Sequence, residues 1–235
     1  MSVALVLFVL ASGEHVRRSV DPLWLSNDAR QQVWPFLRFH DPEVFRDDPV
    51  ADYLLSCLPL GYQAVYRVTA PVVDPRVTSR IIPYLTFGAL LAGVWMTCRA
   101  ISGRLAAWLG VLTVIAAGAP LERMSGGLPR SFAMALVALG AAGMVCRRPR
   151  WLAAAAVAGA AFYPVIGVLL GISLAVYALV WPGLKPTDGG ARNRVAAVRL
   201  TAITGLACLA MGALPSLGSA RYGERVGLDQ HDVYP

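Results

Sequence analysis

The chain has 235 residues, of which 57% are apolar and 15% are charged, and its formal net charge is +7. Soluble globular proteins are about 45–50% apolar and about 25% charged, so this composition excludes a disordered chain and is atypical of a soluble domain. Four cysteines in this length exclude a disulfide-rich secreted scaffold. The composition therefore predicts an all-α, polytopic membrane protein.

The chain begins with an apolar run over residues 2–12, which is about half as long as a membrane-spanning helix. No basic residue precedes this run, which argues against a signal peptide. We therefore expect a first transmembrane helix without its N-terminal half, and a true start upstream of Met1.

Residues 13–80 differ in composition and carry nine acids, eight arginines and many aromatic residues. This mixture is typical of an ordered extracytoplasmic loop that rests on the membrane interface. Short helices are expected within it. Asp28 is a candidate N-cap for a helix that begins at Ala29. The sequences Asp41-Pro42-Glu43 and Asp47-Asp48-Pro49 each indicate a further helix start.

Five apolar runs follow this loop and predict the remaining helices: residues 81–98, 105–121, 131–146, 151–181 and 195–217. A single helix over residues 151–181 would be about 46 Å long at about 1.5 Å per residue, too long for a hydrocarbon core of about 30 Å. Tyr163-Pro164 lies near its middle, where proline interrupts a helix. We favour two short helices that turn there over one tilted pass.

The arginines and the single lysine indicate the topology. Those near Arg99, Arg147 and Lys185 lie in short loops, which the positive-inside rule places in the cytoplasm. The N-terminus is then cytoplasmic, and residues 13–80 and 122–130 are extracytoplasmic. We expect a multi-pass protein of the plasma (inner) membrane, with residues 1–217 as its helical domain and 218–235 as an extracytoplasmic tail.

The lipid bilayer is its expected partner. Nucleic acid is not, because the basic residues do not cluster on a soluble surface.

Three segments resemble blocks of a bacterial branch of the GT-C superfamily of integral-membrane glycosyltransferases. They are NDARQQVWPFLRFHDPEVFRDDPVADYL, GGLPRSFAMAL and AAFYPVIGVLL. The resemblance spans about residues 1 to 215. It implies a polyprenyl-phosphate-linked sugar donor, a catalytic base in the first loop, and in some members a divalent metal. Carried over to this chain, the base is Asp28. Such proteins usually have more helices, so we expect a fragment or a degenerate relative.

A lipid-phosphate leaving group needs positive charge, and arginine binds phosphate through two parallel hydrogen bonds. Arg130 follows Gly126-Gly127-Leu128-Pro129 on the expected side of Asp28, although it could also be a snorkelling interfacial residue. Arg30 and Arg123 are further candidates for substrate binding. Trp24 and Trp34 are expected to desolvate Asp28 and raise the pKa of its carboxyl group.

Three other acids are candidates for a second catalytic acid: Asp47, Asp48 and Glu122. We expect Glu122 to pair with Arg123 or Arg130 rather than to act as a second acid or a metal ligand. The identity of any metal stays open. The histidines, His15, His40 and His231, are expected to be ordinary surface residues.

Two alternatives stay open beside the glycosyltransferase. A transporter-like protein would place ionisable residues near the middle of its spans, and the predicted spans contain no Asp, Glu, Lys or His. A non-catalytic membrane scaffold would keep Asp28 and Arg130 apart or paired with structural neighbours.

Overall fold

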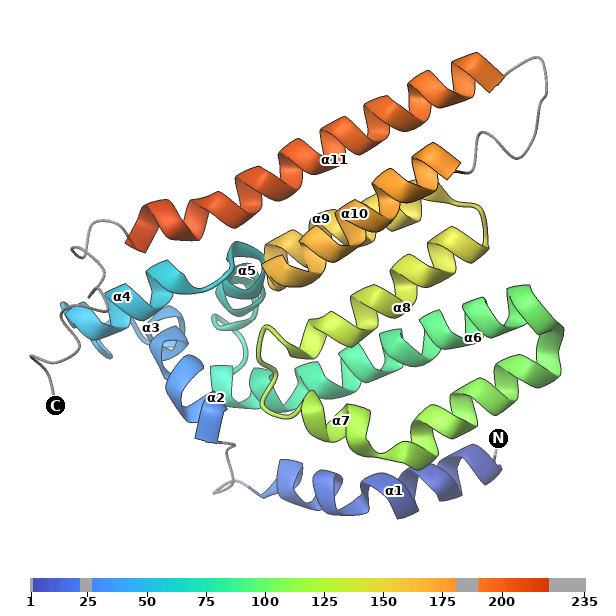
Figure 1. Ribbon diagram of the computed structural model, residues 1–235. Helices are drawn as coiled ribbons and strands as arrows, with labels where there is room; N and C mark the ends of the chain where they lie inside the picture. The colour runs from blue at the N-terminus through green and yellow to red at the C-terminus, as the bar shows by residue number, and fades with distance from the viewer. Residues whose placement is uncertain (1, 22–26, 181–189, 220–235) are drawn as a thin grey trace, which may run out of the picture.

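The computed structural model describes residues 2–21, 27–180 and 190–219, and these contain helices and no strand (Figure 1). The all-α prediction is confirmed for this part of the chain. The helices are α1 (Ser2–Val20), α2 (Asn27–Gln32), η1 (Trp34–Phe36), α3 (Leu37–His40), α4 (Pro49–Cys57), α5 (Leu60–Thr69), α6 (Pro75–Ala117), α7 (Ala119–Arg123), α8 (Ser131–Val145), α9 (Pro149–Phe162), α10 (Pro164–Val180) and α11 (Gly190–Ser219).

Among the described residues, α6 is the one helix that is long and apolar enough to cross a membrane. Its backbone leaves the helical conformation at Gly103, where φ is 85° and ψ is −167°, values that glycine adopts without strain. The chain reverses there and gives two arms, residues 75–102 and 104–117 (Figure 1). Trp95 and Trp108 join the arms edge to face with ring centroids 4.8 Å apart.

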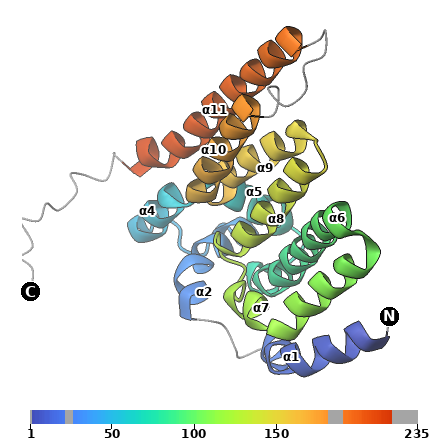
Figure 2. The same cartoon turned by 45° about the vertical axis from the view of Figure 1, so that its right-hand side comes forward.

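The predicted interruption at Tyr163-Pro164 is confirmed. Helix α9 ends at Phe162, Tyr163 is extended with φ −152° and ψ 90°, and α10 begins at Pro164. The two helices then run side by side in opposite directions (Figures 1 and 2). A Cβ at Gly167 would lie 2.4 Å from the Ala160 backbone nitrogen, so glycine is what allows this close approach.

Long apolar side chains remain exposed along the outer faces of three helices. They are Leu85, Leu105 and Leu109 of α6, Val168, Ile172 and Leu179 of α10, and Ile203, Leu206 and Leu209 of α11. Large exposed apolar side chains gathered on helix faces are typical of surfaces that contact lipid or another protein.

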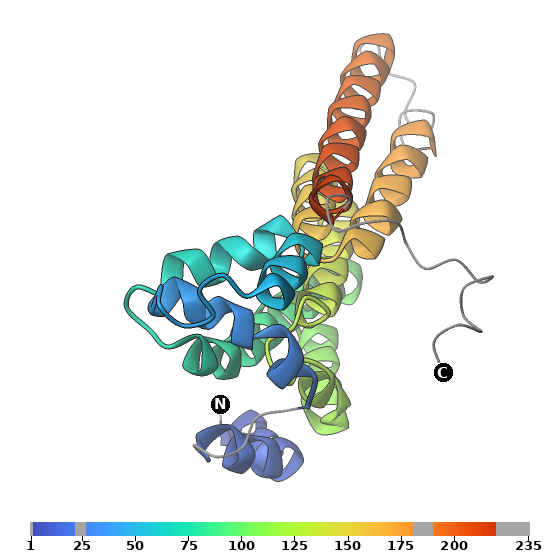
Figure 3. The ribbon, with the colours of Figure 1, turned by 90° about the vertical axis from the view of Figure 1, so that its left-hand side faces the viewer.

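The helices of the first loop form an ordered group beside one end of the longer helices (Figure 3). Their core is aromatic. The Phe36 ring stacks on the Tyr66 ring at 4.2 Å, and Tyr62 meets both edge to face. Ile82 of α6 and Leu128 of the turn before α8 complete this cluster, so the loop is anchored on the helical domain.

Three predictions about the first loop need correction. Helix α1 continues to Val20 instead of ending near residue 12. Helix α2 begins at Asn27, so Asp28 lies in its first turn and is not its cap. Asp41-Pro42-Glu43 starts no helix, because Phe45 and Asp47 both have φ 57°, and Asp41 instead accepts a hydrogen bond from the Glu43 amide.

The capping role predicted at Asp47-Asp48-Pro49 is confirmed for Asp48. Its carboxylate accepts hydrogen bonds from the backbone N–H groups of Val50 and Ala51, at 2.8 and 3.2 Å. Predictions for Trp24, for the loop around Lys185 and for His231 lie outside the described residues, as does all of the proposed C-terminal tail beyond residue 219.

Candidate functional site

The turn between α7 and α8 is held rigidly against α6. Gly126 and Gly127 have φ of 83° and 60°, which glycine alone adopts readily. A Cβ at Gly127 would lie 2.6 Å from the Ser79 carbonyl oxygen. The Ser131 hydroxyl closes the turn by donating to the Met124 carbonyl at 2.7 Å. This packing therefore fixes the backbone of Arg130, the last residue of the turn.

Helix α2 is anchored on the same core as this turn. Ala29 of α2 and Val33, which directly follows this helix, are fully buried, and they join the aromatic cluster that also contains Leu128. The Tyr66 hydroxyl adds a long contact of 3.5 Å, donating to the Gly127 carbonyl. The first loop and the turn thus share one packing unit.

This shared core brings Asp28 and Arg130 together. Arg130 Nη2 lies 2.6 Å from Asp28 Oδ2, and the two side chains are 52% and 48% exposed. The two residues that the sequence predicts on one side of the membrane are thus in direct contact. The arrangement offers a carboxylate and a guanidinium group, both open to solvent and set on two rigid supports.

The predicted desolvation of Asp28 by aromatic residues is wrong for the part that the structure describes. About half of the Asp28 side chain is exposed. Trp34 packs edge to face on Phe45, with ring centroids 4.5 Å apart. Proximity in the sequence suggested that Trp34 would cover Asp28, but α2 ends at Gln32, before Trp34 begins η1.

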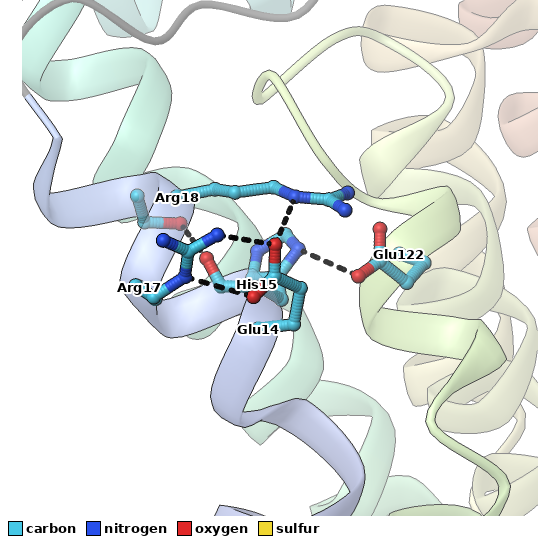
Figure 4. Close-up of polar contacts among 6 residues, drawn as sticks. Glu14, His15, Arg17, Arg18 and Glu122 are labelled. Carbon is cyan, nitrogen blue, oxygen red and sulfur yellow. Dashed lines mark hydrogen bonds and ion pairs between the residues drawn. The ribbon is translucent and has the colours of Figure 1, made fainter.

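Glu122 of α7 has a different partner from the arginines that we expected. Its Oε1 lies 3.7 Å from Nδ1 of His15, which comes from α1 (Figure 4). His15 is only 2% exposed, so the expectation of a surface histidine is wrong. Its ring meets Tyr84 of α6 edge to face at 5.7 Å. Burial lowers the pKa of His15, and the Glu122 carboxylate opposes this effect.

The Glu14 carboxylate of α1 lies beside this pair, and both of its oxygens accept hydrogen bonds. Glu14 accepts hydrogen bonds of 2.9 Å from Arg17 and from Arg18 (Figure 4). These guanidinium groups lower the pKa of the Glu14 carboxyl group to about 2. The sequence spacing of three and four residues along a helix could have shown this cluster, but nothing local in the sequence pointed to His15.

The other candidate residues do not join the Asp28–Arg130 pair. Arg30 and Arg123 are exposed and form no ion pair with another described residue. Asp47 is exposed in the turn before α4, and Asp48 caps that helix.

A metal site does not emerge from the described residues. No group of three or more His, Cys, Asp or Glu side chains gathers within residues 2–21, 27–180 and 190–219. The chemistry that the site offers on its own is acid–base chemistry at Asp28 and anion binding at Arg130. Comparison of the chain with protein-family models, with curated proteins and with solved structures found no match.

Proposed function

We propose that this chain is a GT-C-like membrane glycosyltransferase, or part of one, that transfers a sugar from a polyprenyl-phosphate donor on the extracytoplasmic face of the plasma (inner) membrane. The observation that carries the proposal is the contact between Asp28 and Arg130. The two residues required by the proposed chemistry come from segments that are remote in the sequence, and they meet where both remain open to solvent.

A multi-pass arrangement with a cytoplasmic N-terminus is part of this proposal. The outward faces of α6, α10 and α11 are apolar, as a lipid surround requires. The turn between the two arms of α6 and the turn between α8 and α9 lie at one end of the molecule, while α2 lies at the other (Figure 1). Asp28 belongs to α2 and contacts Arg130. The end with the arginine-containing turns is then cytoplasmic by the positive-inside rule, and the ion pair is extracytoplasmic.

Each residue of the pair has a defined role in the proposed reaction. Asp28 accepts the proton of the acceptor hydroxyl, whose oxygen attacks the anomeric carbon of the sugar. The bond from that carbon to the phosphate oxygen breaks, and its electron pair leaves with the phosphate. Arg130 binds the phosphate and offsets the charge that develops on it.

The direct ion pair implies an exchange of partners during this cycle. The Asp28 carboxylate contacts the guanidinium group that would bind the phosphate. Donor binding would draw Arg130 to the phosphate and leave Asp28 free to accept a proton. The carboxylate and the phosphate therefore compete for Arg130.

A non-catalytic scaffold is the second candidate, because the same contact could serve only to tie α2 to α8. Measuring sugar transfer by the Asp28→Asn variant distinguishes the glycosyltransferase from the scaffold. We expect Asp28→Asn to abolish transfer from polyprenyl-phosphate-linked sugars. The matched control is Asp52→Asn, which breaks the ion pair between Asp52 and Arg38 in the same loop. Unchanged transfer in Asp28→Asn, or an equal loss in both variants, would contradict the proposal.

A further inference from the structure

The end of the molecule away from the ion pair carries a group of exposed arginines, which we call the arginine end. It consists of Arg99 and Arg104, which flank the Gly103 turn, and Arg148 and Arg150, which lie at the start of α9. All four side chains are exposed. They lie in separate parts of the sequence, so a charged patch depends on whether the two turns are neighbours.

Helix packing shows that the two turns are neighbours. The first arm of α6 and α8 run in the same direction (Figures 1 and 2). They touch at Gly93, where a Cβ would lie 2.7 Å from the Ala138 side chain. From this contact the chain runs ten residues to Gly103 and seven to Val145, where α8 ends. At about 1.5 Å per residue these lengths differ by only about 5 Å, so both turns end at a similar level.

The described part of the chain offers the arginine end no carboxylate. Glu122 is the only acid between residues 75 and 180, and it lies at the opposite end beside His15. Residues 2–13 and 190–219 contain no acid at all. Four positive charges thus accumulate at one end without a negative side chain from these segments. A partner that supplies negative charge would remove this repulsion.

The surface next to these arginines indicates what kind of partner this is. Trp108 and Trp151 are 47% and 42% exposed, and the Arg148 guanidinium group lies over the Trp151 ring, 4.7 Å from its centroid. Tryptophan favours the boundary between lipid chains and headgroups. Exposed Ile101 and Leu105 adjoin the turn. An anion that meets this surface therefore has hydrocarbon directly beside it.

We propose that the arginine end binds the headgroups of anionic phospholipids. The guanidinium groups contact the lipid phosphates and the net negative charge of the leaflet, while the tryptophans lie at the level of the glycerol backbone. A soluble polyanion would satisfy the arginines but not the adjoining apolar surface. This inference does not depend on the proposed sugar transfer, since it concerns the other end of the molecule.

Lipid retention by the full chain tests the proposal directly. The protein is purified in a mild detergent and mixed with phosphatidylglycerol or phosphatidylcholine of identical acyl chains, and the bound lipid is counted by native mass spectrometry. We expect preferential retention of phosphatidylglycerol that weakens with salt. Equal retention of the two lipids would overturn the proposal. Equal retention of glycerol phosphate, which lacks the chains, would also overturn it.

Variants locate the binding. Arg148→Gln/Arg150→Gln should reduce phosphatidylglycerol retention by at least about fivefold, given the usual contribution of a basic residue near an anionic surface. Arg148→Lys/Arg150→Lys keeps the charge and should retain most of the binding. The matched control removes two charges at the other end, Arg17→Gln/Arg46→Gln. A loss in this control as large as in the first variant would show that binding is not located at the arginine end.

Discussion

Replacing Asp28 by asparagine removes a negative charge from the Asp28–Arg130 pair and leaves the size of the side chain unchanged. If carboxylate and donor phosphate compete for Arg130, this change frees the guanidinium group. Asp28→Asn should therefore bind a polyprenyl phosphate more tightly than the wild type, although it cannot transfer sugar. A purely structural ion pair predicts no such gain.

The expected magnitude follows from the exposure of the pair. Both side chains are about half-exposed, so solvent screens their attraction. Exposed ion pairs contribute about 0.2–1 kcal/mol. Losing the competition should therefore lower the Kd for a polyprenyl phosphate by at most about fivefold. Arg130→Gln removes the phosphate ligand itself. A charge-assisted hydrogen bond contributes about 1.5–3 kcal/mol, so the Kd should rise by about tenfold or more.

Binding of undecaprenyl phosphate, the probe without a sugar, is measured by titration of the detergent-solubilised chain. Asp28→Asn and Arg130→Gln should change the Kd in opposite directions, and the Asp52→Asn control should leave it unchanged. Thermal unfolding in the same detergent checks that each variant is folded. Weaker binding in both Asp28→Asn and Arg130→Gln, or no change in either, would refute the competition.

Three further predictions concern the stability of the folded chain. Gly127→Ala should destabilise the fold by about 1–3 kcal/mol, because the added Cβ would lie 2.6 Å from the Ser79 carbonyl oxygen at a φ of 60°; an unchanged unfolding temperature would contradict this packing. Asp48→Ala should cost about 1 kcal/mol through loss of the α4 cap, and Asp48→Asn should restore most of it in the same thermal assay. Because burial lowers the pKa of His15, its contribution to stability is complete above its ordinary pKa of about 6.5 and falls as the pH drops below that value. Glu122→Gln should steepen this acid-induced loss in thermal unfolding between pH 5 and pH 8, and a stability of the wild type that does not change over this range would count against a neutral, buried His15.

Local sequence signals predicted two of the helix boundaries correctly. Proline interrupted the long apolar run at Tyr163-Pro164, and Asp48 capped the helix that begins at Pro49. Both depend on a few adjacent residues. The same logic failed at Asp41-Pro42-Glu43, because the positive φ of Phe45 bends the chain away from a helix. A positive φ at a residue other than glycine is not predictable from the local sequence.

Contacts between remote segments were only partly predictable. The arrangement of apolar runs and positive charges predicted a shared side of the membrane for Asp28 and Arg130, and this stays a prediction. Their direct contact required the aromatic core that joins α2 to the turn before α8, which sequence periodicity does not show. The burial of His15 against Tyr84 was not predictable, because it depends on how α1 packs against α6.

The most direct test of the proposed function is sugar transfer in proteoliposomes that contain the full chain. Polyprenyl phosphates that carry mannose, glucose or arabinose, with the radiolabel in the polyprenyl chain, are supplied as donors together with a membrane extract that provides acceptor hydroxyl groups, and release of free polyprenyl phosphate is followed by thin-layer chromatography. We predict that the wild type releases it from at least one donor, that Asp28→Asn does not, and that Asp52→Asn does. No release by the wild type from any donor, or equal release by Asp28→Asn, would contradict the assignment of Asp28 as the base of a glycosyltransferase.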